Sequence, residues 1–464
     1  MRSESDSGLR RLVLGVVATL SLLAHPVSAG EAKKGVVIIA PKRFHEALKD
    51  FVAHKTTLMP TELVSLQEIL MSSPGVDDPE RLKRFLFTAW KERNAGYALL
   101  VGDADVLPVR YMVLDRATPE AFDYAFYPSD LYYADLAKKD GKFDDWNGRK
   151  DGFHAGYFGE VRGEKNKDDP INYDAIDYRP DIAVGRWPVS TEEEVRRVAK
   201  KTMDFERRSL AGNGPGVRKA AYFSVGGWVD SRGMMDRLAR TLPKGWSADE
   251  RFYGRRGSNA PDESGLVSIM NDGVSLIFHA GHGSDDSWEG CTSLGSLLPK
   301  LTNADRLPIV LSAGCSTARF ATLPPYEPYV DVDGHEHKGS NFGEVFRAPP
   351  SPPAVYQRGK YNPSGLGEGL LRREANGAVA YIGCNTGSQP CGLTLLEGFS
   401  AALAKQGEPR LGDCWSGALA HYYDAEHLET IRPTADWYPA SIFFQGMKFM
   451  LFGDPSLRMP APGR

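Results

Sequence analysis

Two short apolar runs constrain the fold of this 464-residue chain more than any other feature. They cover residues 274–281 and 307–314, and each ends at a glycine. Runs of this length and composition are typical of buried parallel β-strands. Ligand sites in parallel sheets gather beyond the carboxyl ends of the strands. We therefore expect the residues that follow, His282 and Cys315, to lie side by side although 33 positions separate them.

The side chains after the two runs have the chemistry of a thiol nucleophile and its base. A cysteine thiolate is the attacking species, and a neighbouring imidazole can take up its proton. Gly283 has no Cβ, so its backbone can approach a substrate carbonyl closely and its N–H can point toward a developing oxyanion. The N–H of Cys315 is the natural second donor. The pattern predicts Cys315 and His282 as the catalytic pair, with Gly283 and Cys315 forming an oxyanion hole.

The rest of the chain alternates apolar runs with helical patterns, which predicts an α/β fold with mostly parallel sheets flanked by helices. A cluster of glycine and proline at 211–216 interrupts the alternation. We therefore expect two consecutive α/β subdomains, 30–210 and 211–464, with the catalytic pair in the second. The expected strands are 35–40, 97–102, 181–185, 220–224, 274–281, 307–314 and 378–383.

The N-terminus, residues 1–29, has the layout of a secretory signal peptide. An arginine pair precedes an apolar run at 12–23, and small residues at 27–29 offer a cleavage site. The run is short for a membrane span, which argues against an uncleaved anchor. We expect a mature chain without a membrane span that is secreted, periplasmic or at the cell surface. The formal net charge of −4 gives no basic surface for nucleic acid.

Short motifs spread along the chain resemble those of one peptidase family. They are LVGD at 100–103, DIAVGRW at 181–187, GHGS at 281–284, SW at 287–288, LTNADRLP at 301–308, RF at 319–320 and FGDPSL at 452–457. Together they are similar to the gingipain family of secreted bacterial cysteine peptidases, which have a caspase-like fold. The resemblance implies an endopeptidase that acts on protein or peptide substrates through Cys315 and His282. It implies no cofactor for catalysis.

Two further residues are candidates for substrate binding. Relatives that cleave after basic residues use an acidic residue in the specificity pocket, and Asp230 lies near the corresponding position. The alternative for Asp230 is the N-cap of a helix over 232–242. Trp288 either packs against the pocket wall or has a structural role. The acid with which the family orients the imidazole has no counterpart, because Val225 stands at that position. Either a backbone carbonyl or an acid from elsewhere then orients His282.

A turn-rich stretch between residues 123 and 181 carries many carboxylates with glycines between them. Such a stretch can wrap a hard cation, although the spacing is not that of an EF-hand loop. The resemblance is also consistent with a structural calcium ion here, because some members of the family bind one. The alternative is a solvated insertion that holds no ion. The candidate ligands are Asp130, Asp135, Asp140, Asp144 and Asp145.

The chain has five cysteines, and an odd count leaves one thiol unpaired in an exported protein. With Cys315 as the nucleophile, the other four can pair. Cys384 and Cys391 flank a six-residue loop and are the first choice for a disulfide bridge. The alternative is that all four are small buried apolar residues.

Three histidines outside the catalytic pair have a simpler interpretation. His279 lies inside the first apolar run, and a strand would point it away from His282. We expect it to be a buried, hydrogen-bonded core residue. His335 and His337 stand in a polar loop that is expected to be solvated rather than to bind a metal.

Three functions are consistent with these observations. The first is a secreted endopeptidase, in which water releases the acyl-enzyme. The second is a transpeptidase, in which an amine takes the acyl group and the same residues serve. The third is a non-catalytic binding protein of the same fold, against which the intact His282 and Cys315 argue. The sequence has no serine nucleophile elbow and no HExxH zinc motif, so other hydrolase classes are disfavoured.

Overall fold

The computed structural model describes residues 34–115, 125–151, 155–162, 171–210, 218–348, 350–358, 364–405, 410–432 and 440–459. The expected signal peptide at 1–29 and the Gly/Pro cluster at 211–216 lie outside these residues. The described residues, which begin at Lys34, form one compact unit, and those of the two expected halves both belong to it.

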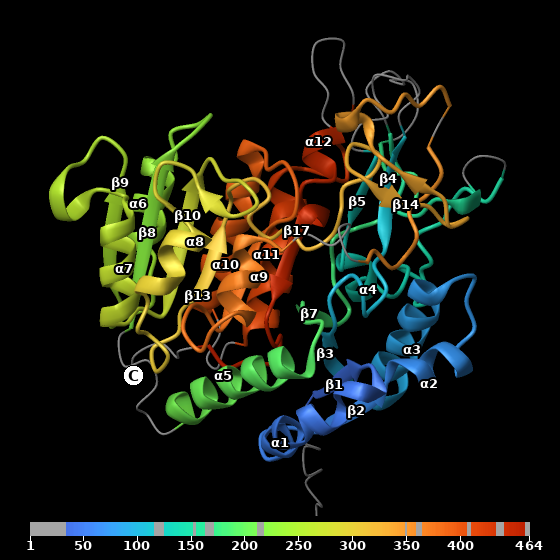
Figure 1. Ribbon diagram of the computed structural model, residues 1–464, viewed down its shortest axis with the longest axis horizontal. Coiled ribbons are helices and arrows are strands. Elements are labelled where there is room, and N and C mark those ends of the chain that lie inside the picture. The colour runs from blue at the N-terminus through green and yellow to red at the C-terminus, as the bar shows by residue number, and fades with distance from the viewer. Residues whose placement is uncertain are drawn as a thin grey trace, which may run out of the picture. The chain divides into compact units, whose positions relative to one another are not determined.

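A ten-stranded β-sheet runs through both halves of the chain (Figure 1). In spatial order its strands are β2 (Thr61–Ser65), β1 (Gly35–Ala40), β3 (Ala95–Val101), β7 (Ala183–Trp187), β17 (Phe449–Phe452), β16 (Ala380–Cys384), β13 (Ile309–Ser312), β10 (Leu276–Gly281), β8 (Lys219–Gly226) and β9 (Ser247–Phe252). Neighbouring strands are parallel, except that β16 and β17 are antiparallel. The α/β class and the mostly parallel sheet predicted from the sequence are confirmed.

The antiparallel pair divides this sheet into two parallel halves that run in opposite directions. The halves meet where β17 pairs with β16, with Phe452 opposite Tyr381. The carboxyl ends of β8, β10, β13 and β16 therefore share one edge of the sheet, while those of β1, β3 and β7 lie at the other edge. Asp103, which follows β3, is buried there and accepts a hydrogen bond from Arg372 (Nη1 to Oδ2, 2.9 Å).

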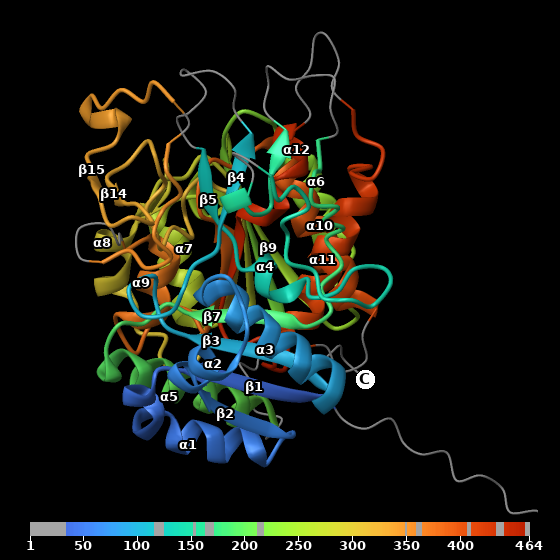
Figure 2. The same ribbon diagram turned by 90° about the vertical axis from the view of Figure 1, so that its right-hand side faces the viewer.

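Both faces of the sheet are buried, which explains the continuous apolar runs in the sequence. Along β10, Leu276 and Phe278 belong to one hydrophobic core and Ile277 to the other. The first core includes side chains from α2 (Leu66–Ser72), α3 (Asp78–Arg93), α6 (Arg232–Arg240), α10 (Leu393–Lys405) and α11 (Leu411–Ala425). The second includes side chains from α1 (His45–Thr56), α5 (Glu192–Leu210), α7 (Glu263–Asp272), α8 (Leu294–Leu297) and α9 (Leu366–Arg372). Figure 2 shows α10 and α11 on one side of the sheet and α8 and α9 on the other.

Smaller elements extend from the loops. Short strands pair as β4 (Tyr111–Asp115) with β5 (Phe126–Pro128) and β6 (Val161–Arg162), β11 (Ser287–Trp288) with β12 (Thr292–Ser293), and β14 (Tyr329–Val330) with β15 (Glu336–His337). Short helices are α4 (Leu131–Ala134), α12 (Ala440–Phe443), η1 (Lys42–Phe44), η4 (Gly257–Asn259), η5 (Leu298–Lys300), η6 (Ser340–Phe342), η8 (Pro390–Gly392) and η9 (Gly446–Lys448). Within the described ranges, no helix has the length and apolar character needed to cross a bilayer.

Candidate active site

The structure brings His282 and Cys315 together at one edge of the sheet. His282 follows the last residue of β10, and Cys315 lies three residues beyond the end of β13. Because β10 and β13 are neighbours and parallel, their loops leave the sheet at the same edge. Both residues line one cavity of about 50 Å³, together with the loops that follow β8 and β16.

Two glycines allow the strand ends to approach this closely. Gly281 has φ of +144°, and a Cβ there would lie 2.3 Å from the carbonyl oxygen of Gly226. A Cβ on Gly283 would lie 2.9 Å from the carbonyl oxygen of Cys315 and 2.7 Å from Cγ2 of Thr317. Real Cβ atoms do not approach other atoms so closely. Only glycine therefore fits at either position without moving the catalytic loops.

Two backbone N–H groups beside the thiol are free to bind an oxyanion. In the loop after β10, the N–H of Ser284 donates to the carbonyl oxygen of Ser287 at 3.0 Å. In the loop after β13, the N–H of Ser316 donates to a backbone carbonyl at 2.8 Å. By contrast, the N–H groups of Gly283 and Cys315 have no hydrogen-bond acceptor among the described residues. These are the two donors that the sequence analysis expected at this place.

The loop after β16 supplies a contact to the nucleophile that the sequence analysis missed. The backbone N–H of Ser388 donates to Sγ of Cys315 at 3.3 Å. An N–H directed at sulfur stabilises negative charge there. The side chain of Lys448, which is buried, donates from Nζ to the carbonyl oxygen of Gly387 at 2.8 Å and so holds the loop from the other side. A backbone donor depends on no residue type, so the sequence carried no signal for it.

The expected disulfide bridge between Cys384 and Cys391 is wrong. Both are free thiols in the structure, as are the other three cysteines. Burial raises the pKa of Cys384 to about 12 and that of Cys391 to about 11. Burial also raises the pKa of Cys291 and Cys414 to about 12. These four thiols are therefore poor nucleophiles. Cys384 and Cys414 are buried, as the alternative expected, whereas Cys291 and Cys391 are half-buried.

His282 is positioned through its backbone. Its N–H donates to the carbonyl oxygen of Gly226 at 3.1 Å, and its carbonyl oxygen accepts from the N–H of Glu289 at 3.1 Å. Among the described residues, no group forms a hydrogen bond with its imidazole. The ring of Trp228 lies edge-on to it, with the ring centroids 6.4 Å apart. Neither of the orienting groups considered from the sequence, a backbone carbonyl or a distant acid, is therefore in place.

The sequence left two roles open for Trp288, packing against the pocket wall or a structural role, and the structure shows the structural one. Its indole is buried and stacks on the ring of His279, with centroids 4.2 Å apart and planes 1° from parallel. Its Nε1 donates to the hydroxyl of Tyr381 at 3.2 Å. His279 forms a hydrogen bond from Nδ1 to Oγ of Ser312 at 2.9 Å, and burial lowers its pKa to about 3. His279 is thus the neutral core histidine that was expected, and Trp228 rather than Trp288 lines the cavity.

Asp230 lies outside the cavity that it was expected to serve. Its neighbours Trp228, Val229 and Ser231 line the cavity, but Asp230 does not. Its carboxylate accepts hydrogen bonds from Nε and Nη2 of Arg232 at 2.9 and 2.7 Å. These hydrogen bonds hold the pKa of the carboxyl well below its usual range. Because Arg232 neutralises it, Asp230 is not placed to bind a basic substrate side chain.

The sequence comparison identifies the family to which these loops belong. The sequence matches the profile of Peptidase family C25 over residues 30–460. This chain belongs to peptidase family C25. The resemblance to gingipains seen in the short motifs is therefore confirmed.

Solved structures share the C25 fold at low sequence identity. The crystal structure of the Arg-specific cysteine proteinase gingipain R aligns with a TM-score of 0.58 and 17% identity, covering 94% of this chain and 80% of that one. The complex of the RgpB pro- and mature domains of Porphyromonas gingivalis aligns with a TM-score of 0.56 and 16% identity, covering 91% of this chain and 79% of that one. At such identities the likeness establishes the fold alone.

A curated relative comes from an archaeon. An uncharacterized protein of Archaeoglobus fulgidus is 22% identical over an alignment 319 positions long, which covers 61% of this C25 chain and 66% of the relative. The match thus spans about two thirds of the relative's own length.

Three of the five aspartates expected to bind calcium in this C25 chain, Asp135, Asp140 and Asp144, line one cavity, and Asp130 and Asp145 do not line it. Asp130 is paired with Arg186, with Oδ2 2.7 Å from Nε and Oδ1 2.7 Å from Nη2. The other four accept hydrogen bonds from protein groups as well. Asp135 accepts from Nε1 of Trp146, and Asp140 accepts from Nζ of Lys142. Asp144 accepts from the N–H of Trp146, and Asp145 accepts from Nζ of Lys150.

A lysine supplies the positive charge near two of these aspartates. The ammonium of Lys83 is buried 4.3 Å from the ring centroid of Tyr132, and it interacts electrostatically with Asp135 and Asp144. Burial lowers the pKa of Lys83 and raises the pKa of Asp135. Protein cations therefore compensate part of the acidic charge for which the sequence suggested calcium.

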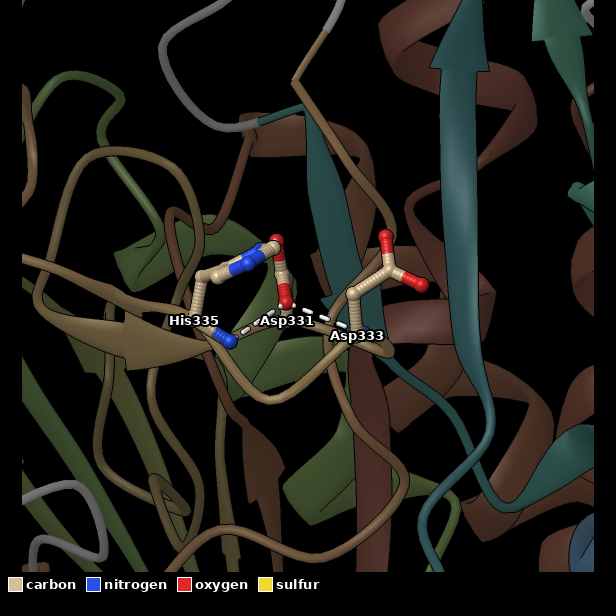
Figure 3. A group of neighbouring side chains, drawn as sticks. All are labelled: Asp331, Asp333 and His335. Carbon is tan, nitrogen blue, oxygen red and sulfur yellow. Dashed lines mark hydrogen bonds and ion pairs between the residues drawn. The ribbon is translucent and has the colours of Figure 1, made fainter.

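A different group of possible metal ligands lies in the loop between β14 and β15 (Figure 3). Ligand atoms of Asp331, Asp333 and His335 come within 4.8 Å of one another. One carboxylate oxygen of Asp331 already accepts the N–H groups of Asp333 and His335 at 3.0 and 2.8 Å. Its other oxygen lies 3.1 Å from Nε2 of His337. The loop's own hydrogen bonds thus account for this carboxylate. The side chain of His335 is solvated, as expected from the sequence, but that of His337 is only 19% exposed.

Proposed function

We propose that this C25 chain is a cysteine endopeptidase in which Cys315 is the nucleophile and His282 the acid and base. One observation supports this above the others. The thiol and the imidazole line the same cavity, and the N–H groups of Gly283 and Cys315 stand beside them without an acceptor among the described residues. Membership of a peptidase family makes a protein or peptide the substrate class.

The proposed reaction uses these groups in two steps. The thiolate of Cys315 attacks the peptide carbonyl carbon, and the two N–H groups hold the resulting oxyanion. His282 gives its proton to the leaving amine nitrogen, and the C–N bond breaks to leave a thioester. His282 then takes a proton from water, which attacks the thioester and releases the acid and the thiol. The N–H of Ser388 stabilises the sulfur whenever it carries negative charge.

A thiol-dependent cleavage assay tests the proposal. The chain from residue 30 onward should cleave peptides, and Cys315→Ala should abolish the cleavage. Cys291→Ala is a matched control, because that thiol lies outside the cavity. Iodoacetamide should alkylate Cys315 before the four cysteines whose pKa burial raises. Full activity in Cys315→Ala would refute the assignment.

The same assay separates hydrolysis from transfer to an amine. With a competing amine present, an endopeptidase gives mainly the free acid, whereas a transpeptidase gives the amide. The masses of the products distinguish the two.

We also propose that the protein is exported. The support is the arginine pair, the apolar run at 12–23 and the small residues at 27–29. N-terminal sequencing of protein recovered from outside the cytoplasm should then begin near residue 30. A chain that keeps Met1 would contradict the proposal.

A further inference from the structure

The cavity beside Cys315 has walls without charge. Trp228 and Val229, from the loop after β8, line it, as do Pro390 and Leu393 from the segment after β16. Ala313, which follows β13, lines it as well. Among the described residues, no Asp, Glu, Lys or Arg side chain lines it. Its chemistry is therefore apolar, apart from the catalytic groups and a few neutral polar side chains.

Among the described residues that line this cavity or adjoin its wall in sequence, no acid is placed to serve a basic substrate side chain. Asp230 adjoins the wall in sequence, but Arg232 occupies both of its carboxylate oxygens. A lysine, arginine or carboxylate that entered the cavity would lose water without gaining an opposite charge. Such a burial is strongly unfavourable. The cavity therefore discriminates against charged side chains of either sign.

The cavity is also small. Its volume is about 50 Å³, which is about a third of the roughly 150 Å³ of an engineered apolar cavity that binds benzene. It therefore accommodates a hydrogen, a methyl or a hydroxymethyl group, but not an aromatic ring. Trp228, which lines the cavity, is 83% exposed.

The position of the cavity indicates which substrate residue fills it. Ser388 lines the cavity, and its N–H contacts the sulfur of Cys315. The side chain next to the carbonyl that this sulfur attacks is therefore the one that enters. We infer that this peptidase cleaves after small uncharged residues, namely Gly, Ala or Ser. The inference rests on the proposed function and names its substrate class.

Fluorogenic peptides that differ only at the residue before the scissile bond test the inference. The set contains Gly, Ala, Ser, Phe, Lys, Arg and Asp at that position. We expect kcat/KM for Ala to exceed that for Lys, Arg and Asp by roughly tenfold or more, because the charged side chains would be buried without a partner. Equal or faster cleavage after Lys, Arg, Asp or Phe would overturn the inference. If Cys315→Ala abolishes that cleavage, the proposed function would stand. Failure to cleave any peptide in the set would overturn both.

A substitution in the wall gives an independent measurement. Val229 is 43% exposed, so Val229→Asp should fold and place a carboxylate at the cavity. It should raise the Lys-to-Ala ratio of kcat/KM by roughly tenfold through charge pairing. Val345→Asp, at a 75% exposed position that does not line the cavity, is the control and should leave the ratio unchanged. An unchanged ratio in Val229→Asp would show that this cavity does not bind the side chain before the scissile bond.

Discussion

The backbone N–H of Ser388 donates a hydrogen bond to Sγ of Cys315, with nitrogen and sulfur 3.3 Å apart. The donor lies in the loop after β16 and the sulfur in the loop after β13, and both strands end at the same edge of the sheet. Lys448 holds the loop by donating to the carbonyl oxygen of Gly387. The nucleophile thus depends on three strand ends, and not only on the two that carry the catalytic pair.

Removal of this N–H should slow the attack. Ser388→Pro lacks the donor, and hydrogen bonds to charged groups contribute about 1.5–3 kcal/mol, or roughly 10- to 100-fold in rate. We therefore expect kcat/KM and the rate of alkylation by iodoacetamide to fall together. Ser388→Ala keeps the N–H and is the matched control. Alkylation at the wild-type rate in a folded Ser388→Pro protein would contradict the role of the donor.

Gly283→Ala should lower kcat strongly while leaving the fold intact. The new Cβ would lie 2.9 Å from the carbonyl oxygen of Cys315, so the loop must shift and carry its N–H away from the oxyanion. The loss of an oxyanion donor lowers kcat by about 10²–10³-fold. Gly295→Ala is the control, because a Cβ there meets no heavy atom within 4 Å. Near-normal kcat in Gly283→Ala would argue against an oxyanion hole at this place.

The stability of an Asp130 variant should show whether Asp130 serves in an ion pair with Arg186 or as a calcium ligand. Both side chains are buried, and removing one partner of a buried ion pair costs about 3–5 kcal/mol. Asp130→Asn should therefore lower the unfolding free energy by a similar amount, whether calcium or EDTA is present. Asp145→Asn, whose partner Lys150 is exposed, should have a much smaller effect. Urea unfolding under both conditions measures this. A loss of stability that appears only with calcium would indicate that Asp130 is a ligand.

The features that were predicted correctly from the sequence are those that depend on local residue patterns. The apolar runs ending at glycine indicated β10 and β13, and their parallel pairing follows from the alternation of strands and helices. The antiparallel pairing of β16 with β17 was not predicted. It forms because β17, near the C-terminus, lies between β7 and β16, and no local sequence pattern indicates this position in the sheet. Two contacts around single residues were missed for similar reasons. The ring of Trp288 stacks on His279, and Arg232 forms an ion pair with Asp230. Both contacts depend on the folded backbone, and the residue types in the sequence do not reveal them.

The pH dependence of stability should show the charge on His337 in the loop between β14 and β15. Burial opposes that charge, but hydrogen bonds with Glu344 at 2.8 Å and Asp331 at 3.1 Å outweigh burial and raise the pKa of His337. His335 also faces Asp331, at 3.4 Å. A raised pKa means that the stabilisation is fully present below the unfolded value of about 6.5 and is lost as pH rises through the folded value. The melting temperature of His337→Gln should therefore fall further below wild type at pH 5.5 than at pH 9. An equal difference at both pH values would mean that His337 contributes through packing on Tyr329 alone.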